Sequence, residues 1–485
     1  MKNANDPVAN VATGLLIGGE WRNASDGATF DVVDPASEKV IATVASASVE
    51  DGLAAVAVAH RAGPEWSARP PRERGEILRK AFELLTAKKD DLAKLITLEN
   101  GKALKDALGE IIYAAEFFRW YAEEAVRNIS EISMAPSGAH RILVLQQPVG
   151  VSLLITPWNF PAAMGTRKIG PALAAGCSVI LKPASETPLT ALAIGDVLHE
   201  AGVPPGVVNV IPSNRSAEAC RAILADERCR KLSFTGSTEV GRILLAEAAK
   251  TVVNCSMELG GNAPFLVFAD ADIDAAVEGA MIAKMRNGGE ACTAANRFFV
   301  ETPVAEEFAT KFAAAMSALK VGPGLDPDVD LGPMVNGAAC ADISALVDDA
   351  VSKGAKVVTG GRPQDGIGFF FAPTVLVDVP ANANILKEEI FGPVAPVVTF
   401  EGADDAIAKA NDTEYGLICY IYTGDLAKGL RVAERLESGM VGLNRGVVSD
   451  PAAPFGGVKQ SGIGREGAHD GLLEFLEKKY IAADW

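Results

Sequence analysis

The sequence lacks the features that would point to nucleic acid or to a membrane. Its 485 residues hold 45 lysine and arginine side chains against 62 aspartate and glutamate side chains, so the formal net charge is −17. This excess of negative charge argues against nucleic acid or an anionic membrane as the main partner. No run of eighteen apolar residues occurs, and the polar segment 1–11 has no apolar stretch of the kind found in signal peptides. We therefore expect neither a membrane span nor an export signal.

Histidine is scarce, and no two cysteines form a CxxC pair. The four histidines are isolated from one another: His60, His140, His199 and His469. Because metal sites need clustered ligands, we predict no metal site. Seven cysteines are scattered along the chain: Cys177, Cys220, Cys229, Cys255, Cys292, Cys340 and Cys419. Dispersed cysteines in a long chain are typical of a reducing compartment, so we expect a cytoplasmic protein.

What the sequence does have is a large apolar content. Apolar residues make up 49% and charged residues 22% of the chain, which is enough for extensive cores in at least two domains. In the middle of the chain, short apolar runs alternate with helical stretches. We expect strands at 149–156, 178–182 and 207–211, and helices at 168–175 and 191–200. This βαβ pattern indicates a parallel, doubly wound sheet.

A second series of the same kind follows the segment 257–261. It has strands at 263–268, 298–300 and 357–359, and a helix that begins within the acidic stretch 270–274. The sequence therefore predicts an α/β protein with two doubly wound domains, joined by 257–261.

Four further segments complete the expected organisation. Helical periodicity is strong over 73–96 and resumes over 107–121. The segments 141–146 and 478–485 have the pattern of strands that lie outside either domain. We expect them to form a small protruding sheet that joins subunits.

Two glycine-rich strings match nucleotide-binding motifs only in part. Gly462–Gly467 has GxGxxG spacing, but the chain ends too soon after it to build the rest of a βαβ nucleotide-binding unit. Gly236–Gly241 has the glycine spacing of a P-loop but continues with Arg242 and Ile243, where lysine and serine or threonine are required. This second string follows an apolar stretch and opens a helix, which suits a pyrophosphate bound at a helix N-terminus.

Two other strings point to catalysis. Cys292 closely follows Gly288 and Gly289, and small residues beside a cysteine leave room for a substrate carbonyl. Glu258 is followed by Gly260 and Gly261, which allow the backbone to approach a ligand. A cysteine nucleophile and a carboxylate base are what acyl chemistry through a thioester requires.

Together with five more strings, these resemble the aldehyde dehydrogenase family over nearly the whole chain. The strings lie at 156–161 (TPWNFP), 181–184 (LKPA), 234–238 (FTGST), 257–262 (MELGGN), 286–297 (RNGGEACTAANR), 388–393 (EEIFGP) and 454–462 (PFGGVKQSG). The resemblance implies a dinucleotide-binding domain (residues 1–125 and 147–256), a catalytic domain (257–463) and an oligomerisation sheet (126–146 and 464–485). It also implies a homodimer or homotetramer.

The resemblance assigns roles to three catalytic residues. Cys292 attacks the aldehyde carbon, and the product of hydride loss is a thioester on this cysteine. Asn159 and the backbone N–H of Cys292 form an oxyanion hole, in which one donor is worth roughly 3 kcal/mol in comparable enzymes. Glu258 activates the water that hydrolyses the thioester. A carboxylate at this position speaks against the coenzyme-A-acylating branch of the superfamily, in which a thiol replaces water.

The resemblance also implies a nicotinamide dinucleotide cofactor. Its expected binding residues are Thr156, Pro157, Trp158, Lys182, Ser185, Gly236, Ser237, Glu389 and Phe391. Many NAD-preferring relatives have a glutamate where this chain has Ser185, and here Glu186 is displaced by one position. A serine removes the carboxylate that would repel a 2′-phosphate, and Arg215 is expected to place a cation nearby. We therefore predict NADP or NAD, with NADP accepted and even preferred.

Three residues match the subfamily that oxidises succinate semialdehyde. Arg167 and Arg286 correspond to the arginines that grip the distal carboxylate of the substrate, and Ser449 matches a third binding residue. A guanidinium binds a carboxylate bidentately and would select an aldehyde with a distal carboxylate over a neutral one.

Two departures from that subfamily keep alternatives open. Ala294 replaces a second cysteine that allows a disulfide switch in some members. Arg445 stands where relatives carry glutamate or threonine, so glutarate semialdehyde or another carboxylated or small aldehyde remains a candidate. An alternative of another class is a noncatalytic binding protein with the same fold, which the joint presence of Cys292, Glu258 and Asn159 disfavours.

Overall fold

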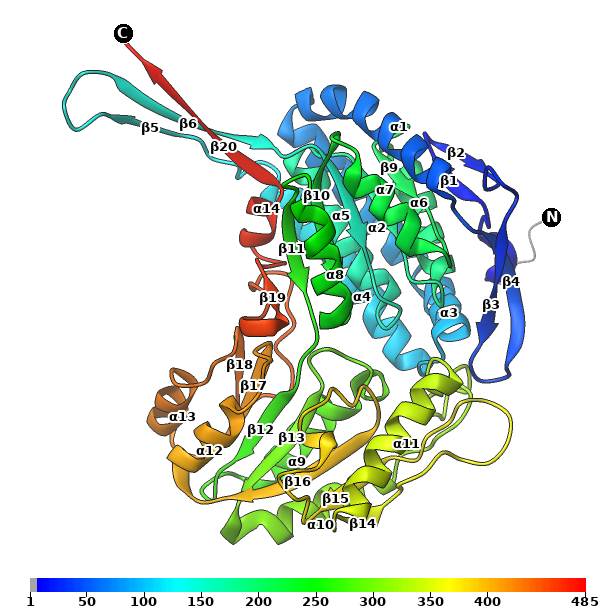
Figure 1. The fold of residues 1–485 in the computed structure, drawn as a ribbon, viewed down its shortest axis with the longest axis vertical. Coiled ribbons are helices and arrows are strands. Elements are labelled where there is room, and N and C mark those ends of the chain that lie inside the picture. The colour runs from blue at the N-terminus through cyan, green and yellow to red at the C-terminus, as the bar shows by residue number, and fades with distance from the viewer. Residues whose placement is uncertain (1–6) are drawn as a thin grey trace.

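The computed structural model describes residues 7–485. The first six residues, which belong to the polar segment 1–11, lie outside this range. Two α/β units are stacked along the long axis of the molecule, and a narrow three-stranded sheet projects from one end (Figure 1). None of the helices described between residues 7 and 485 is long and apolar enough to cross a membrane.

The first unit is built around an eight-stranded sheet in the order β19-β11-β10-β7-β8-β9-β1-β2. The five central strands are parallel: β11 (Asn254–Glu258), β10 (Cys229–Thr235), β7 (Val151–Ile155), β8 (Val179–Lys182) and β9 (Val208–Val210). The strands expected at 149–156, 178–182 and 207–211 correspond to β7, β8 and β9. The edge strands are antiparallel and were not expected: β1 (Leu15–Ile17), β2 (Glu20–Arg22) and β19 (Gly462–Ile463).

Helices cover both faces of this sheet. The helix expected at 168–175 begins earlier, as α5 (Pro161–Ala175), and every residue of it is buried. The proline at its first turn explains the earlier start, since proline is favoured where the backbone N–H needs no partner. The other helices of this unit are α1 (Val49–Ala68), α2 (Pro71–Ala87), α3 (Lys89–Asn100), α4 (Leu104–Glu124), α6 (Pro188–Ala201), α7 (Ser216–Ala225) and α8 (Thr238–Ala249).

The single helical stretch expected over 73–96 is two helices. The chain leaves helical geometry at Lys88, which has φ −97° and ψ 8°, so that α2 ends and α3 begins there. The first turn of α3 contains Asp90 and Asp91. Acidic side chains are favoured at a helix N-terminus by the helix dipole, and they mark this new start within an unbroken apolar periodicity.

The second unit contains a seven-stranded sheet in the order β14-β15-β16-β13-β12-β17-β18. Only the pair β14–β15 is antiparallel. Its strands are β14 (Lys356–Thr359), β15 (Thr374–Val377), β16 (Val394–Phe400), β13 (Ala295–Glu301), β12 (Ala263–Val267), β17 (Ile418–Tyr422) and β18 (Met440–Leu443). Its helices are α9 (Ile273–Met285), α10 (Ala305–Ser317), α11 (Gly337–Ser352), α12 (Gly402–Asn411) and α13 (Leu426–Ala433).

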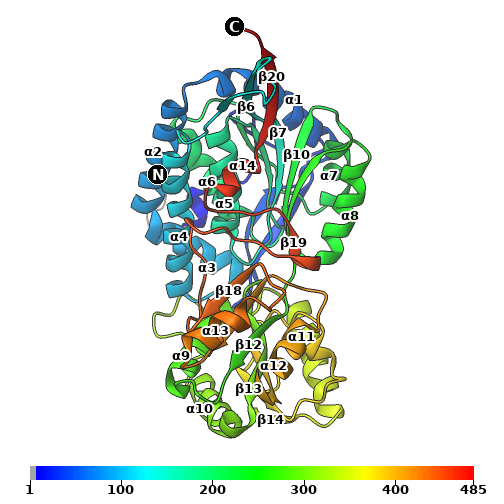
Figure 2. The same cartoon turned by 90° about the vertical axis from the view of Figure 1, so that its left-hand side faces the viewer.

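The chain passes between the two units twice. It leaves the first sheet at the end of β11 and enters the second at β12, so residues 259–262 connect them. After β18 the C-terminal segment returns, and Gly462 of β19 pairs with Glu258 of β11 (Figure 2). Both crossings therefore bring backbone close to Glu258.

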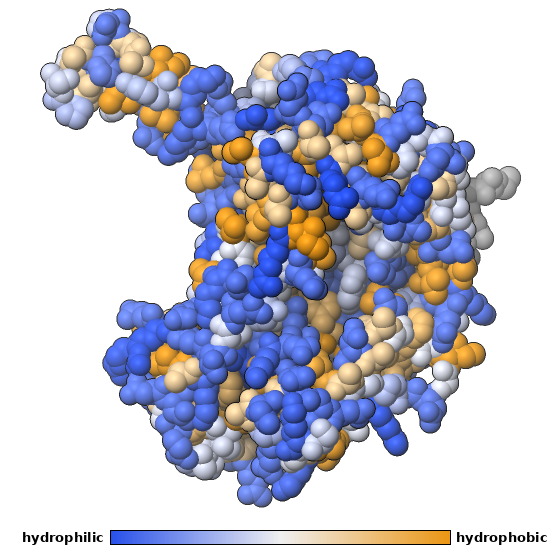
Figure 3. Space-filling model, in the orientation of Figure 1, coloured by the Kyte–Doolittle hydropathy of each residue, from blue (hydrophilic) through white to orange (hydrophobic). Residues whose placement is uncertain are grey.

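The protruding sheet has the order β20-β6-β5. Its strands are β5 (Glu131–Met134), β6 (Arg141–Pro148) and β20 (Leu476–Ala483), and α14 (Asp470–Leu473) precedes β20. The strands expected at 141–146 and 478–485 are thus paired with each other. Apolar side chains are visible on this sheet in Figure 3, and Ile132 and Trp485 are 69% and 74% exposed. A separate two-stranded hairpin consists of β3 (Thr29–Asp34) and β4 (Lys39–Ala45).

Candidate active site

A cavity of about 220 Å³ lies where loops of both units meet. Its lining comes from the loops after β7 and β10, from the connection between the units, and from the segments around Cys292 and Glu389. Eight residues predicted from the sequence line it: Pro157, Trp158, Asn159, Gly236, Ser237, Cys292, Glu389 and Phe391. The structure thus brings together residues that are far apart in the chain.

The loop before Cys292 has an unusual backbone. Asn287, Gly288 and Gly289 have positive φ values of 52°, 62° and 82°. A Cβ atom on Gly289 would lie 2.2 Å from the carbonyl oxygen of Gly392. Glycine is therefore required here by a left-handed turn and a close backbone approach, in addition to the open space expected from the sequence.

The side chain of Cys292 is half-buried, and its surroundings disfavour the thiolate form. Burial raises the pKa of its thiol to about 12, Arg167 opposes this shift, and Glu389 and Glu258 add to it. Arg286 also lowers the pKa. At neutral pH the thiol is protonated, so attack needs a proton acceptor or added positive charge in the cavity.

The amide of Asn159 is fixed beside the Cys292 loop. Its Nδ2 donates to the carbonyl of Glu290 at 2.9 Å, and its Oδ1 is buried, with no hydrogen-bond partner among residues 7–485. Its own carbonyl accepts from Lys102 Nζ at 2.6 Å and from Asn287 Nδ2 at 2.9 Å. An amide nitrogen has two protons, so one remains for a ligand in the cavity.

Glu258 ends β11 and is 4% exposed, and its buried Oε2 atom has no hydrogen-bond partner in the part of the chain that the structure describes. Burial, followed by the negative charge of Glu466, raises the pKa of the Glu258 carboxyl well above its usual range, while Lys168 and Arg167 oppose the shift. A carboxylate with a raised pKa is a better acceptor for a proton from water than an exposed one.

The start of α8 has the features of an anion-binding helix terminus. Ser237 is the N-cap and accepts from the backbone N–H of Val240 at 3.3 Å. A Cβ on Gly236 would lie 2.5 Å from the Phe234 ring, so glycine lets the loop close tightly. Val240 and Ile243 are 45% and 55% exposed on the same helix, which leaves an apolar face beside the terminus. We did not predict this face from the sequence.

Lys182 and Ser185 lie outside the 220 Å³ cavity. Lys182 ends β8 and is 8% exposed, burial lowers its pKa, and no hydrogen-bond acceptor for its Nζ is found among residues 7–485. Ser185 Oγ donates to Glu186 Oε2 at 3.1 Å. The cation expected from Arg215 is engaged elsewhere, because Arg215 Nη2 lies 2.7 Å from Asp26 Oδ2. Thr156, also predicted, is buried at the end of β7 and donates its N–H to the Lys182 carbonyl at 3.2 Å.

Glu389 and Phe391 face the cavity from a short segment before β16. Glu389 Oε1 accepts from the backbone N–H of Gly261 at 3.2 Å. Burial raises the pKa of the Glu389 carboxyl to about 7, and Gly261 and Lys284 oppose the shift. The ring of Phe391 packs edge-on against Trp158 with the centroids 5.3 Å apart. The N-terminus of α8 and the cavity lining fit the nicotinamide dinucleotide expected from the sequence, because a helix N-terminus can hold a pyrophosphate.

The predicted substrate residues form a second group close to Cys292. Arg286 Nη1 lies 3.5 Å from Ser449 Oγ, and its guanidinium is 5.0 Å from the centroid of the Phe160 ring. Arg167 is 2% exposed and stacks on Phe455 at 4.1 Å. Both arginines oppose the rise in the Cys292 pKa, and Phe160, on which Arg286 stacks, directly follows the cavity residue Asn159.

Comparison with known proteins agrees with this geometry. The model of the family described as "Aldehyde dehydrogenase family" matches residues 21–481. The chain belongs to the aldehyde dehydrogenase family. It is 56% identical to the succinate-semialdehyde dehydrogenase of Paenarthrobacter nicotinovorans, covering 91% of this chain and 98% of the relative. It is 50% identical to the glutarate-semialdehyde dehydrogenase of Pseudomonas putida, covering 96% of each chain.

The fold of this aldehyde dehydrogenase is also that of its solved relatives. A crystal structure of an NADP-dependent enzyme of Escherichia coli superimposes with a TM-score of 0.97 at 49% sequence identity and covers 98% of each chain. The predicted α/β fold with two doubly wound units and a small β extension is therefore confirmed.

Two buried charged residues of the dehydrogenase were not found from the sequence. Lys168 Nζ donates to Glu466 Oε1 and, at 2.9 Å, to Ser233 Oγ. Glu466 in turn raises the pKa of Glu258. Glu466 lies in the GxGxxG string that we rejected as a nucleotide fingerprint, and its importance arises only when β19 pairs with β11. The only sequence signal was the adjacency of Lys168 to Arg167.

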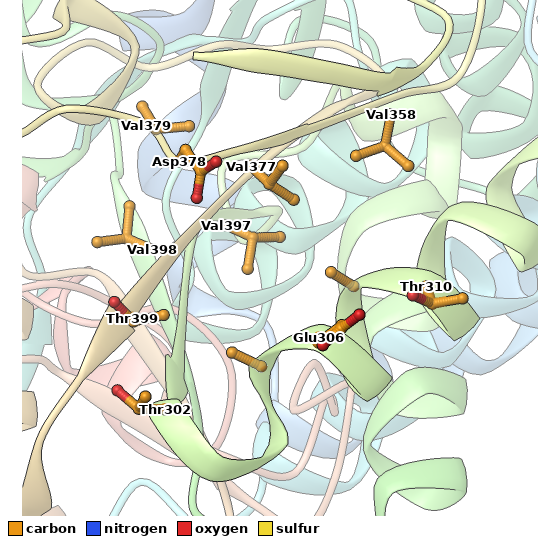
Figure 4. A pocket seen from close by; sticks show the side chains of 12 residues that line it. Thr302, Glu306, Thr310, Val358, Val377, Asp378, Val379, Val397, Val398 and Thr399 are labelled. Carbon is orange, nitrogen blue, oxygen red and sulfur yellow. The ribbon is translucent and has the colours of Figure 1, made fainter. Parts of the chain in front are cut away.

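A larger cavity of the dehydrogenase lies on the second unit and has a different character. It measures about 440 Å³ and is flanked by α10, β15 and β16. Five valines and three threonines line it together with Glu306 and Asp378 (Figure 4). This lining contains no cysteine, lysine, arginine or histidine, so the chemistry of the smaller cavity has no counterpart there.

Proposed function

We propose that this aldehyde dehydrogenase oxidises an aldehyde with a distal carboxylate, and succinate semialdehyde in particular, to the corresponding acid. The observation that carries the proposal is the placement of Arg167 and of the Arg286–Ser449 pair close to the half-buried Cys292. Two guanidinium groups near one nucleophile favour an anionic substrate. Arg167 shares its buried partner Glu466, at 3.6 Å, with Lys168, and no ion-pair partner of Arg286 is found among residues 7–485, so a neutral alkyl chain would leave positive charge only partly compensated. The names of the two similar dehydrogenases support the same substrate class.

In the proposed reaction Cys292 is the nucleophile. The thiol first loses its proton to solvent water, and the thiolate then attacks the aldehyde carbon. The oxygen that becomes negative is bound by the free N–H of the Asn159 amide and by the backbone N–H of Cys292. NADP or NAD, held by the residues named below, would supply the hydride acceptor, so that the carbon bound to Cys292 becomes a thioester. Glu258 takes a proton from a water molecule, the resulting hydroxide attacks the thioester carbonyl, and the C–S bond breaks to release the acid.

We propose NADP or NAD as the hydride acceptor, with NADP accepted readily. Its adenosine and phosphate groups would be bound by Lys182, Ser185, Gly236 and Ser237. Its nicotinamide half would be bound by Glu389 and Phe391. The surrounding surface of the binding site would be formed by Thr156, Pro157 and Trp158. Lys182 supports the acceptance of a 2′-phosphate, because it is buried and no acceptor for its Nζ is found in the described part of the chain. The NADP-dependent relative in Escherichia coli supports it as well.

Glutarate semialdehyde is the second candidate substrate. The similar glutarate-semialdehyde dehydrogenase favours it. The guanidinium of Arg445 is exposed, and its Nε donates to the carbonyl of Val447 at 2.8 Å. No hydrogen bond between Arg445 and the Arg286–Ser449 pair is found among residues 7–485, so we expect a longer substrate to use the same two arginines.

We further propose three domains: a dinucleotide-binding domain (1–125 and 147–256), a catalytic domain (257–463) and an oligomerisation sheet (126–146 and 464–485). The last of these would join identical chains into a homodimer or homotetramer. The exposed apolar residues of the protruding sheet support this assembly, since isolated three-stranded sheets with exposed apolar side chains gain stability by packing. We place the protein in the cytoplasm, in line with its seven free cysteines.

The proposal is tested by measuring kcat/KM for succinate semialdehyde, glutarate semialdehyde and neutral butyraldehyde, each with NADP and with NAD. We expect succinate semialdehyde to exceed butyraldehyde by about a hundredfold, as a carboxylate–guanidinium grip worth roughly 3 kcal/mol would give. Equal values for succinate semialdehyde and butyraldehyde would contradict the substrate assignment. Absence of turnover with all three aldehydes despite cofactor binding would favour the noncatalytic alternative.

A further inference from the structure

One tyrosine lies close to both of the arginines that we assign to the substrate. The guanidinium carbon of Arg167 is 5.7 Å from the centroid of the Tyr113 ring, and that of Arg286 is 6.0 Å from the same centroid. In addition, Arg167 Nη2 donates to the Tyr113 hydroxyl oxygen at 2.6 Å. Tyr113 therefore lies close to both Arg167 and Arg286.

The hydroxyl group of Tyr113 can donate a hydrogen bond to a ligand. A phenolic oxygen accepts hydrogen bonds and also donates its own proton. The bond from Arg167 uses an acceptor position, and among residues 7–485 no acceptor for the Tyr113 proton is found. A donor hydrogen bond from a guanidinium also polarises the O–H group and strengthens its own donation to a further acceptor.

The helix that carries Tyr113 holds the ring in place. Tyr113 is in the middle of α4, half-buried, and one turn later Phe117 packs against it edge-on with the ring centroids 4.9 Å apart. Phe117 itself lies 5.2 Å from the Arg167 guanidinium. The ring position is therefore set by packing and does not depend on the hydroxyl.

We propose that the Tyr113 hydroxyl is a further substrate-binding group, which donates a hydrogen bond to the distal carboxylate between Arg167 and Arg286. The inference rests on the proposed function, because it assumes an aldehyde with a distal carboxylate. Tyr113 makes the site more selective for that carboxylate, since a neutral substrate would leave the phenolic donor unpaired beside two cations.

The variant Tyr113→Phe tests the inference, because it removes one oxygen and keeps the ring. We expect kcat/KM for succinate semialdehyde to fall about 10- to 100-fold, as for a lost hydrogen bond to a charged group, while the value for butyraldehyde changes by less than about twofold. The inhibition constant of succinate, competing with butyraldehyde, should rise by a similar factor. Tyr480→Phe, which removes a hydroxyl from the protruding sheet, is the matched control.

Three outcomes would overturn the inference. An equal fall for both aldehydes would mean that the hydroxyl only positions Arg167 for catalysis in general. If kcat/KM for succinate semialdehyde is unchanged in Tyr113→Phe while the wild type prefers that substrate, the hydroxyl does not contact the carboxylate. A wild-type enzyme without preference for carboxylated aldehydes would refute the proposed substrate class, and the role of Tyr113 with it. Thermal unfolding and NADP affinity, measured on the same variant, show that the fold and the cofactor site are intact.

Discussion

The backbone of Gly261 lies so close to Cys292 that a Cβ atom on Gly261 would be 2.6 Å from the Cys292 carbonyl oxygen. The same Cβ would be 3.4 Å from Leu417. The connection between the two units therefore packs directly against the residue that carries the nucleophile. Any side chain at 261 must displace the Cys292 loop, the connection, or both.

We accordingly predict that Gly261→Ala lowers kcat by at least about tenfold and destabilises the protein by about 1–3 kcal/mol, the usual cost of overpacking. Activity assays and denaturant unfolding measure the two effects. The control is Gly109→Ala on the exposed side of α4, where a Cβ would meet nothing within 4 Å. That variant should keep full activity and gain up to about 1 kcal/mol from its higher helix propensity. Full activity in Gly261→Ala would contradict the packing argument.

The reactivity of Cys292 should depend strongly on pH in the free enzyme. Burial raises the pKa of the Cys292 thiol to about 12, and only the thiolate is alkylated. We expect the rate of iodoacetamide modification at Cys292, followed by peptide mass spectrometry, to rise about tenfold per pH unit between about pH 7 and 10. Because Arg286 lowers this pKa, Arg286→Met should react more slowly at each pH. A rate that levels off below pH 9 would contradict the raised pKa.

Arg286 should also determine substrate choice. Its guanidinium, next to Ser449 at 3.5 Å, is the less buried of the two proposed carboxylate ligands. We predict that Arg286→Ala loses most of the roughly hundredfold preference for succinate semialdehyde over butyraldehyde, with kcat/KM for butyraldehyde falling only by the smaller factor by which the raised Cys292 pKa slows attack. Arg286→Lys keeps the charge but not the planar fork, and should restore only part of the preference. A variant that loses activity equally on both aldehydes would indicate a structural role for Arg286.

The sequence was sufficient for the parts of the molecule that depend on local pattern. The strands β7, β8 and β9 follow from short apolar runs, and Cys292 and Glu258 from the glycine-rich strings around them. The resemblance to a family added Asn159, Arg167 and Arg286. Each of these sequence signals lies within a few residues of the strand or side chain that it identifies. The reason is that strand burial and close backbone approach limit which residue types can stand at the neighbouring positions.

Contacts between distant segments could not be predicted in this way. Glu466 reaches Lys168 only after the C-terminal segment has returned to pair with β11. Tyr113 contacts Arg167 because α4 packs on α5. The positive φ angles before Cys292 arise from the approach of Gly392. None of these contacts is indicated by a periodicity or a spacing in the sequence, since each depends on how separate elements pack against one another.

Lys284 provides a prediction about stability. It is fully buried on α9, and no hydrogen-bond acceptor for its Nζ is found in the described part of the chain. Burial lowers its pKa from 10.5 to about 7. Between these values the unfolded chain binds a proton that the folded protein does not, so the lysine costs stability in full below about pH 7 and ceases to cost it near pH 10.5.

We expect Lys284→Met to raise the melting temperature at pH 7, by several degrees, and the gain to shrink as the pH approaches 10. Differential scanning calorimetry across this pH range measures it. Lys94→Met, on the exposed side of α3, should leave the melting temperature within about a degree of the wild type at every pH. A gain in Lys284→Met that grows with pH would refute the assigned pKa direction.

The same substitution should weaken cofactor binding, because Lys284 acts on Glu389. Burial raises the pKa of the Glu389 carboxyl to about 7, and the charge of Lys284 keeps it from rising further. Without that charge, Glu389 would be protonated in a larger fraction of molecules at neutral pH and would accept hydrogen bonds from the nicotinamide ribose less well. We therefore predict a higher Kd for NADP in Lys284→Met at pH 7, and a difference from the wild type that narrows at pH 9, where Glu389 ionises in both proteins. Isothermal titration at the two pH values separates this electrostatic effect from a packing defect, which would weaken binding equally at both. A buried lysine that lowers stability would then be retained because it keeps Glu389 ionised for the cofactor.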